Sequence, residues 1–100
     1  MKKYTQEEFN KFEIDEYGFK ICPSGEYSLI KSFGDCCSFG ERCSFGEYCS
    51  FGEKCIFGEK CSFGERCSFG LWNSFNKPKF ENEKSCYFSK TVRSLKEVEE

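Results

Sequence analysis

The middle of the chain follows a strict six-residue pattern of apolar and polar positions. Units of the general form Cys-Ser-Phe-Gly-Glu-x run without interruption from Cys37 to Trp72, and degenerate units at 31–36 and 73–78 extend the pattern at both ends. Each unit carries one large apolar residue and one small apolar residue, separated by a glycine and polar residues. Eight consecutive units therefore occupy residues 31–78, nearly half of the chain.

A six-residue period fits neither an α-helix nor a flat strand. Positions six apart lie about 600° round a helix, so the phenylalanines would spiral over every face. A glycine at every sixth position interrupts a long strand and favours backbone angles that other residues reach only with strain. The pattern instead predicts regular bends, with Phe and Cys pointing inward, glycine at the corner and polar residues facing water. We therefore expect an all-β, parallel β-solenoid in which each unit forms one side of a coil.

The repeat resembles the hexapeptide repeat of left-handed parallel β-helices in its period and residue classes. In that family three six-residue units form one triangular coil of 18 residues, which favours a left-handed β-helix here. The family usually has Ile, Val or Leu where this chain has Phe, so a wider coil, or a flat two-sided coil of two units and 12 residues, is the alternative. The 18-residue coil implies three vertical stacks of rings: Phe33, Phe51 and Phe69; Phe39, Phe57 and Phe75; and Phe45 and Phe63.

The N-terminal flank, residues 1–30, is expected to hold a short helix and a degenerate first side of the solenoid. Thr5-Gln6-Glu7-Glu8 fits a capping box and is followed by two phenylalanines three residues apart, which predicts an amphipathic helix from about 6 to 13. Phe19-Lys20-Ile21 alternates like a strand. Ser24-Gly25-Glu26-Tyr27-Ser28 resembles a degenerate copy of Phe-Gly-Glu-x-Cys. Aligned to the repeat in this way, Tyr27 falls at the variable x position.

The C-terminal flank, residues 79–100, lacks the repeat and is expected to form a cap whose aromatic residues cover the open end of the coil. Val92, Leu95 and Val98 recur at three-residue spacing behind Thr91, which predicts a short C-terminal helix. Open coil ends carry unpaired backbone groups. We therefore expect capping by this helix, or a homodimer formed through an open end or through the helix.

The charge balance narrows the class of partner. With 15 basic and 17 acidic side chains the net charge is −2, which gives neither the basic stripe of a nucleic-acid-binding protein nor the dense acidity of a DNA mimic. Direct nucleic-acid binding is therefore not expected. The polar start of the sequence and the short apolar runs also argue against a signal peptide or a membrane span. We expect a cytoplasmic protein that does not act on a membrane.

The residue types argue against an enzyme. Many hexapeptide β-helices are acyltransferases with a catalytic histidine, and carbonic anhydrases of that shape bind zinc through three histidines, whereas this chain has no histidine. No catalytic residue, cofactor or metal ligand is therefore predicted. Without a signal peptide, the nine cysteines are expected to be reduced and to pack as small apolar residues.

The cysteines also supply the alternative functions. Cys36 occupies the exposed x position of its unit and is the candidate reactive thiol. A column of thiolates suits a soft metal or redox chemistry, although the Cys-x5-Cys spacing differs from the usual Cys-x2-Cys zinc spacing. The chain also fits a modified-peptide precursor, with residues 1–30 as leader and the Cys-rich repeat as the substrate of modifying enzymes.

The x position varies from unit to unit, which marks it as the solvent-facing position of the repeat. Exposed Trp, Tyr and Arg dominate the energetics of protein interfaces, so the partner-binding candidates are Tyr48, Arg66 and Trp72, with the adjacent Leu71. The alternative role of Leu71 and Trp72 is to seal the last coil.

From Phe19 to Trp72 the chain is also similar to bacterial and phage proteins of uncharacterised function, in which tandem Cys-Ser-Phe-Gly-Glu-x units follow a lead-in like Ile21–Gly25. This resemblance implies no activity. With the small size and the lack of a catalytic motif, it favours a non-enzymatic module that binds another protein. One version is an inhibitor of a host-defence or nucleic-acid-processing enzyme, such as an anti-CRISPR protein.

Overall fold

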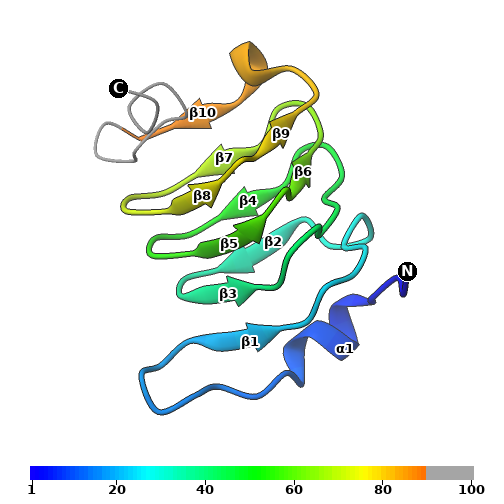
Figure 1. The fold of residues 1–100 in the computed structure, drawn as a ribbon, viewed down its shortest axis with the longest axis vertical. Helices are drawn as coiled ribbons and strands as arrows, with labels where there is room; N and C mark the ends of the chain where they lie inside the picture. The colour runs from blue at the N-terminus through cyan, green and yellow to red at the C-terminus, as the bar shows by residue number, and fades with distance from the viewer. Residues whose placement is uncertain (90–100) are drawn as a thin grey trace.

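The computed structural model describes residues 1–89 and shows an all-β solenoid in which short parallel strands stack in about four turns (Figure 1). Within these residues there is one α-helix, α1 (Gln6–Asn10), and one turn of 3-10 helix, η1 (Glu83–Ser85). The strands are β1 (Lys20–Cys22), β2 (Ser32–Gly34), β3 (Cys37–Phe39), β4 (Ser50–Phe51), β5 (Ile56–Glu59), β6 (Ser62–Phe63), β7 (Ser68–Phe69), β8 (Ser74–Asn76), β9 (Lys79–Phe80) and β10 (Tyr87–Phe88).

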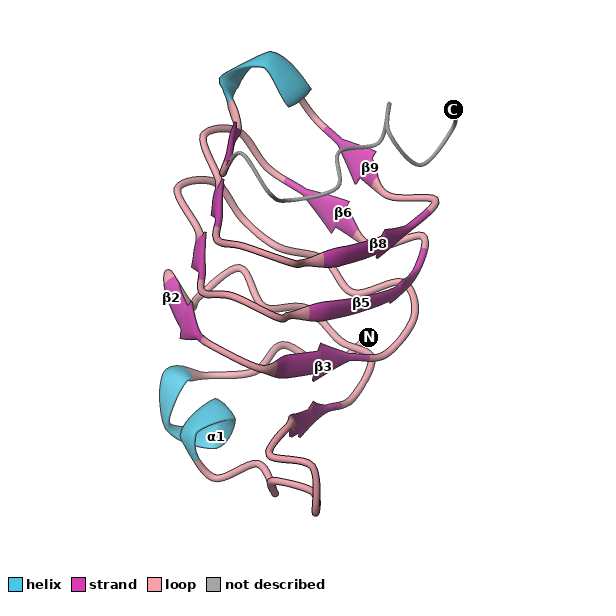
Figure 2. Cartoon of the chain, turned by 90° about the vertical axis from the view of Figure 1, so that its left-hand side faces the viewer, coloured by secondary structure: helices cyan, strands magenta, loops and turns pink. Residues whose placement is uncertain are grey.

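The strands form three parallel sheets, ordered β1-β3-β5-β8, β2-β4-β7-β10 and β6-β9. Ser50 pairs with Ser68 and a bridge joins Ser44 to Ser62, so each residue of the regular repeat lies beside the residue 18 positions later. One coil therefore holds three six-residue units, one on each side (Figure 2). This register confirms the 18-residue coil and excludes the flat two-sided alternative.

Aromatic rings fill the centre of the coils in vertical ladders. Rings 18 positions apart stack face to face, as Phe39 and Phe57 do, with centroids 5.3 Å apart and 1° between the ring planes. Rings on neighbouring sides meet edge to face, as Phe57 and Phe63 do at 85°. Aromatic pairs favour such geometries, and burying each ring contributes about 1.5–3 kcal/mol. The three predicted stacks are confirmed: Phe33, Phe51 and Phe69; Phe39, Phe57 and Phe75; and Phe45 and Phe63.

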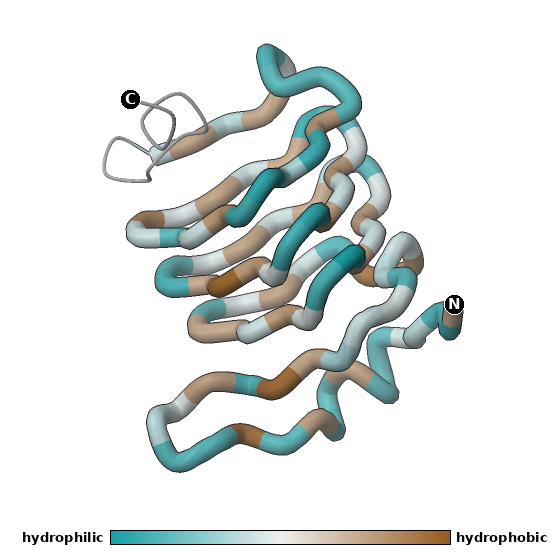
Figure 3. Tube along the Cα trace, in the orientation of Figure 1, coloured by the Kyte–Doolittle hydropathy of each residue, from teal (hydrophilic) through white to brown (hydrophobic). Residues whose placement is uncertain are grey.

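The repeat cysteines are buried beside the rings, and the residue between each Cys and Phe points outward. The strand pattern Cys-Ser-Phe thus alternates inward, outward and inward, as a period of two requires. Figure 3 shows the result as hydrophilic and hydrophobic stretches that alternate along every coil.

The repeat glycines permit the close approach of neighbouring coils and do not form the corners, which corrects the expectation from the sequence. Among the described glycines, only Gly18 and Gly34 have a positive φ. A Cβ atom on Gly64 would lie 2.7 Å from the carbonyl carbon of Gly46 in the adjacent coil. The glycines stack on one another where the backbones are closest, so a side chain has no room there.

Helix α1 covers the N-terminal end of the solenoid. The Glu8 N–H donates to the Thr5 hydroxyl at 3.1 Å and the Thr5 N–H donates to the Glu8 carboxylate at 3.0 Å, which forms the predicted capping box. The helix ends at Asn10, earlier than predicted, because its last turn tightens and the chain turns towards β1. The ring of Phe9 meets the ring of Phe33 edge to face at 5.2 Å, so the helix closes the first coil.

Residues 24–28 form a side of the first coil, but in a different frame from the predicted one. Glu26 bridges in parallel to Ser44, so Tyr27 lies beside Phe45 and takes the phenylalanine position rather than the x position. The two rings stack with centroids 5.6 Å apart, and the Tyr27 hydroxyl donates to the Pro23 carbonyl. The alignment of this segment to the repeat is thus determined by burial of the Tyr27 ring with its hydroxyl hydrogen-bonded, and not by the similarity of Gly25-Glu26 to the Gly-Glu of the repeat.

Strands β9 and β10 continue two of the sheets beyond the regular repeat. Phe80 pairs with Phe63 and Phe88 pairs with Phe69, and both ring pairs stack at 5.1 Å. The predicted C-terminal helix around Leu95 lies outside the described residues. Within residues 1–89, no helix has the length and apolar character needed to cross a bilayer.

Candidate interaction surface

The x residue of the repeat adopts the left-handed backbone conformation at the corner between two sides of the coil. Its φ lies between 53° and 62° at the seven positions from Cys36 to Trp72, a region that non-glycine residues seldom adopt. Within β8 the register shifts by one residue, and Lys77, which precedes the x position Pro78, takes this conformation at the corner with φ of 51°. From Cys36 to Lys60 the N–H of the x residue donates to a carbonyl of the next coil: the N–H of Tyr48 to the carbonyl of Glu65, and the N–H of Lys54 to the carbonyl of Leu71, both at 2.9 Å. The x side chains are thus fixed at the corners and stack in columns.

Each corner of the solenoid carries one column of these corner residues. The three columns are Cys36, Lys54 and Trp72, between the β2-β4-β7-β10 and β1-β3-β5-β8 sheets; Arg42, Lys60 and Lys77, between the β1-β3-β5-β8 and β6-β9 sheets; and Tyr48 and Arg66, between the β6-β9 and β2-β4-β7-β10 sheets.

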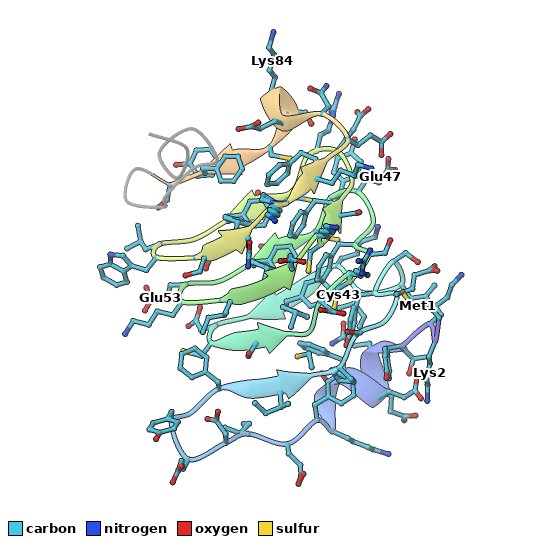
Figure 4. All side chains as sticks on the ribbon, in the orientation of Figure 1. Met1, Lys2, Cys43, Glu47, Glu53 and Lys84 are labelled. Carbon is cyan, nitrogen blue, oxygen red and sulfur yellow. The ribbon has the colours of Figure 1, made fainter. Side chains whose placement is uncertain are left out.

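Two of these columns border the same sheet, β2-β4-β7-β10. The outward residues of its strands lie opposite one another in register and form a row of small polar side chains that ends in a tyrosine: Ser32, Ser50, Ser68 and Tyr87. In Figure 4, Glu47 and Glu53, which precede Tyr48 and Lys54, are labelled at opposite sides of the molecule. We call this row, with the columns at its two edges, the β4–β7 face.

An aromatic side chain and a cation pair at each edge of the β4–β7 face. At one edge the Lys54 Nζ lies 5.6 Å from the centroid of the Trp72 ring. At the other edge the Arg66 Cζ lies 5.7 Å from the centroid of the Tyr48 ring. The two aromatic residues are 54% and 55% exposed, so most of each pair is available to a partner. Exposed cation–π pairs contribute about 0.5–1 kcal/mol, which restrains the rings without hiding them.

The structure brings the predicted site residues onto one face, at its two edges. Tyr48 and Arg66 contact each other, whereas Leu71 and Trp72 lie at the opposite edge, with Leu71 half-buried. The exposure of Trp72 does not fit a residue that seals the last coil, because the rings of the β8, β9 and β10 phenylalanines occupy that end. Sequence reasoning missed Lys54 as the partner of Trp72, although the two are 18 positions apart in the same column.

Similarity to known proteins adds nothing to this picture. The chain matches no family model, curated protein or solved structure. The function is therefore inferred from the surface itself.

The nine cysteines are all free, and the seven in the core donate to backbone carbonyls or pack in vertical pairs. The Cys49 thiol donates to the Gly46 carbonyl at 3.2 Å, and the Cys43 thiol to the Gly40 carbonyl at 3.3 Å. Cysteine therefore satisfies carbonyl groups near the corners that an aliphatic side chain would leave without this donor.

Thiol pairing and burial change the acidity of the core cysteines. A hydrogen bond with the Cys22 thiol, together with burial, raises the pKa of Cys37 to about 12. A hydrogen bond with Cys37 and then burial raise the pKa of Cys55. Contact with the Cys67 thiol and burial raise the pKa of Cys49 in the same way. Cys37, Cys49 and Cys55 therefore stay protonated at neutral pH and act as packing groups. Conversely, hydrogen bonds with the Cys43 and Cys49 thiols lower the pKa of Cys61 and Cys67, respectively.

Two cysteines are less buried. Cys36, the predicted reactive thiol, is half-buried at the base of the Lys54 column, and Cys86 is half-buried on the last coil. Burial raises the pKa of Cys86. Among residues 1–89, no three or more cysteine and acidic side chains gather closely enough to hold a metal ion.

Proposed function

We propose that this protein is a non-enzymatic interaction module that binds another protein through the β4–β7 face. The observation that carries the proposal is the pair of exposed aromatic residues, Tyr48 and Trp72, each restrained by a cation at opposite edges of one sheet. Trp, Tyr and Arg are the residues that most often act as hot spots of protein interfaces.

Rigidity supports this assignment. At the two edges, Tyr48 and Lys54 are corner residues whose N–H groups donate to the next coil, to the Glu65 and Leu71 carbonyls. A partner that docks on such a face orders few additional backbone or side-chain torsions, and the entropy cost of association falls accordingly. The serines between the edges are small, so the centre of the face can be approached closely.

We further propose a left-handed coil, from the resemblance to hexapeptide β-helices, and a cytoplasmic location. Nine free cysteines support the location, because oxidising compartments favour disulfides in small Cys-rich chains. One version of this function is inhibition of a host-defence or nucleic-acid-processing enzyme, in which case the partner would be that enzyme.

The test is capture of the partner from extracts of the source organism on the immobilised protein. We expect one stoichiometric protein to bind the wild type and to bind the Tyr48→Ala/Trp72→Ala variant at least about tenfold more weakly, because truncating one hot spot costs about 2 kcal/mol.

A matched control removes exposed apolar side chains from another sheet. The Ile21→Ala/Ile56→Ala variant, at positions 47% and 42% exposed on the β1-β3-β5-β8 sheet, should bind like the wild type. Equal binding by all three proteins, or equal loss in both variants, would refute the assignment of the β4–β7 face. Failure to capture any protein, with stoichiometric zinc or oxidised thiols in the purified sample, would favour the thiol-chemistry alternative.

A further inference from the structure

The corner opposite the β4–β7 face carries a column of positive charge. Arg42 and Lys60 occupy the x positions there, and Lys77, one residue before the x position of its unit, takes the third place in the column, with φ of 56°, 62° and 51°. The N–H of Arg42 donates to the carbonyl of Glu59 at 2.8 Å, and the N–H of Lys60 donates to the carbonyl of Asn76 at 2.9 Å, so the three coils are in direct contact at this corner. Figure 3 shows the hydrophilic segments one above another where β3, β5 and β8 end.

A fourth cation and a hydroxyl group complete the cluster. Lys79 on β9 is paired in register with Ser62 on β6, and both lie beside the corner column. These five residues and Pro78 line a cavity of about 560 Å³, which is open to solvent. Small-molecule sites typically have volumes of about 300–1,000 Å³, so the cavity is large enough for a small ligand.

The cations of this pocket have no ion-pair partners among residues 1–89. The ion pairs within 4.0 Å in that part of the chain are Lys2–Glu8 and Lys3–Glu26, both near the N-terminus. Glu41 precedes the first cation of the column and Glu59 the second, but Asn76 precedes the third.

The pocket therefore has four cationic side chains and two adjacent carboxylates. Each of the other two columns holds a single cation: Lys54 lies between Cys36 and Trp72, and Arg66 lies beside Tyr48. Like charges stacked on neighbouring strands repel one another, and an anion placed between them would remove that repulsion.

We propose that this pocket binds the oligophosphate group of a small ligand, such as the phosphate chain of a nucleoside triphosphate. Four cationic residues line this one pocket, and their combined charge favours a ligand with several negative charges, an oligophosphate rather than a single carboxylate. The Arg42 guanidinium offers a planar fork to phosphate oxygens, the lysines act as point charges and the Ser62 hydroxyl is a neutral donor. The pocket and the β4–β7 face lie on different parts of the solenoid, so this proposal is independent of the proposed function.

The test is a titration of the full chain with inorganic tripolyphosphate at low salt, followed by calorimetry and by NMR of the backbone amides. The wild type should show saturable binding at one site, with shift changes centred on Arg42, Lys60, Ser62 and Lys79. The Lys60→Gln/Lys77→Gln variant should bind about tenfold or more weakly. A parallel titration with ATP separates two sources of the ligand: tighter binding of ATP assigns a nucleotide, and equal binding assigns a free oligophosphate.

Lys54→Gln is the matched control, because Lys54 occupies the same backbone position, with φ of 61°, at another corner. It should bind tripolyphosphate within about twofold of the wild type, and circular dichroism should show all three proteins folded. The proposal fails if the wild type does not saturate, or if Lys54→Gln loses as much affinity as the double variant. Binding of a long single-stranded DNA without binding of tripolyphosphate would also overturn it.

Discussion

Within each six-residue unit, the glycine and the residue two positions later have different structural roles. The glycine leaves room for the adjacent coil, as the 2.7 Å approach at Gly64 requires, while the x residue supplies the left-handed corner. This division explains why the bulky and charged side chains can vary at x: they project from a corner into solvent, and only their backbone is constrained.

If the repeat glycines allow the close approach of coils, the loss of stability caused by a Gly→Ala substitution should depend on the position of the glycine. Gly64→Ala should lower the free energy of unfolding by about 1–3 kcal/mol, because the new Cβ overlaps the Gly46 backbone. Gly46→Ala is the control, since its Cβ would meet the carbonyl oxygen of Ser28 at the milder distance of 3.3 Å. Urea unfolding of both variants measures the difference, and equal losses would contradict the close-approach role.

The buried thiols predict that stability falls in alkaline solution. The pKa of Cys37 is raised from 9.0 to about 12 in the folded protein, so the unfolded chain releases this proton first. Its contribution is complete below about pH 9 and is lost as the pH rises towards 12, at up to about 1.4 kcal/mol per pH unit. Urea midpoints under reducing conditions should therefore fall from pH 9 to 10.5. The slope should be shallower in Cys37→Ala, and a slope identical to that of the wild type would refute this origin.

Among the elements, the short strands owe their stability to the ladders behind them. Strands of two to four residues, such as β4 and β5, are too short to persist in isolation, but Phe51 of β4 and Phe57 of β5 stack on rings of the coils above and below. The stability of a side should therefore depend on whether its ring has neighbours in both directions.

Two phenylalanines of one ladder test this dependence. Phe57 stacks between Phe39 and Phe75, whereas Phe75 ends the described ladder and is half-buried. Phe57→Ala should cost about 3–5 kcal/mol, as large-to-small substitutions of buried rings do, and Phe75→Ala clearly less. Thermal unfolding of the two variants provides the measurement, and a larger loss for Phe75→Ala would contradict the ladder account.

Much of the arrangement of the strands can be predicted from the six-residue period. The period and residue classes predict the solenoid, the inward Phe and Cys and the three ladders, because these depend on repeated local alternation. The frame of Tyr27 and the role of the glycines depend on contacts between coils, which no single unit reveals. The same holds for the pairing of Lys54 with Trp72, which becomes visible only when the x positions are compared at 18-residue separation.

In the whole molecule, the faces and corners of the triangular solenoid carry different types of side chain. Both edges of the β4–β7 face carry cation–π pairs, and the column at the opposite corner consists of the three cations Arg42, Lys60 and Lys77. A binding partner on the first surface and an anionic ligand at the second would not compete for space. We propose that the β4–β7 face is the surface that binds another protein.

The measurement that tests this claim most directly compares two outward serines that occupy the same position in the repeat. Ser68 lies at the centre of the β4–β7 face on β7, whereas Ser74 lies on β8 in another sheet, and both are exposed beside a phenylalanine of the core. We expect Ser68→Glu to weaken binding of the captured partner about tenfold or more, because a buried, unpaired carboxylate is costly, and Ser74→Glu to bind like the wild type. Unchanged binding of Ser68→Glu with loss in Ser74→Glu would contradict the claim and move the interface to the β1-β3-β5-β8 sheet.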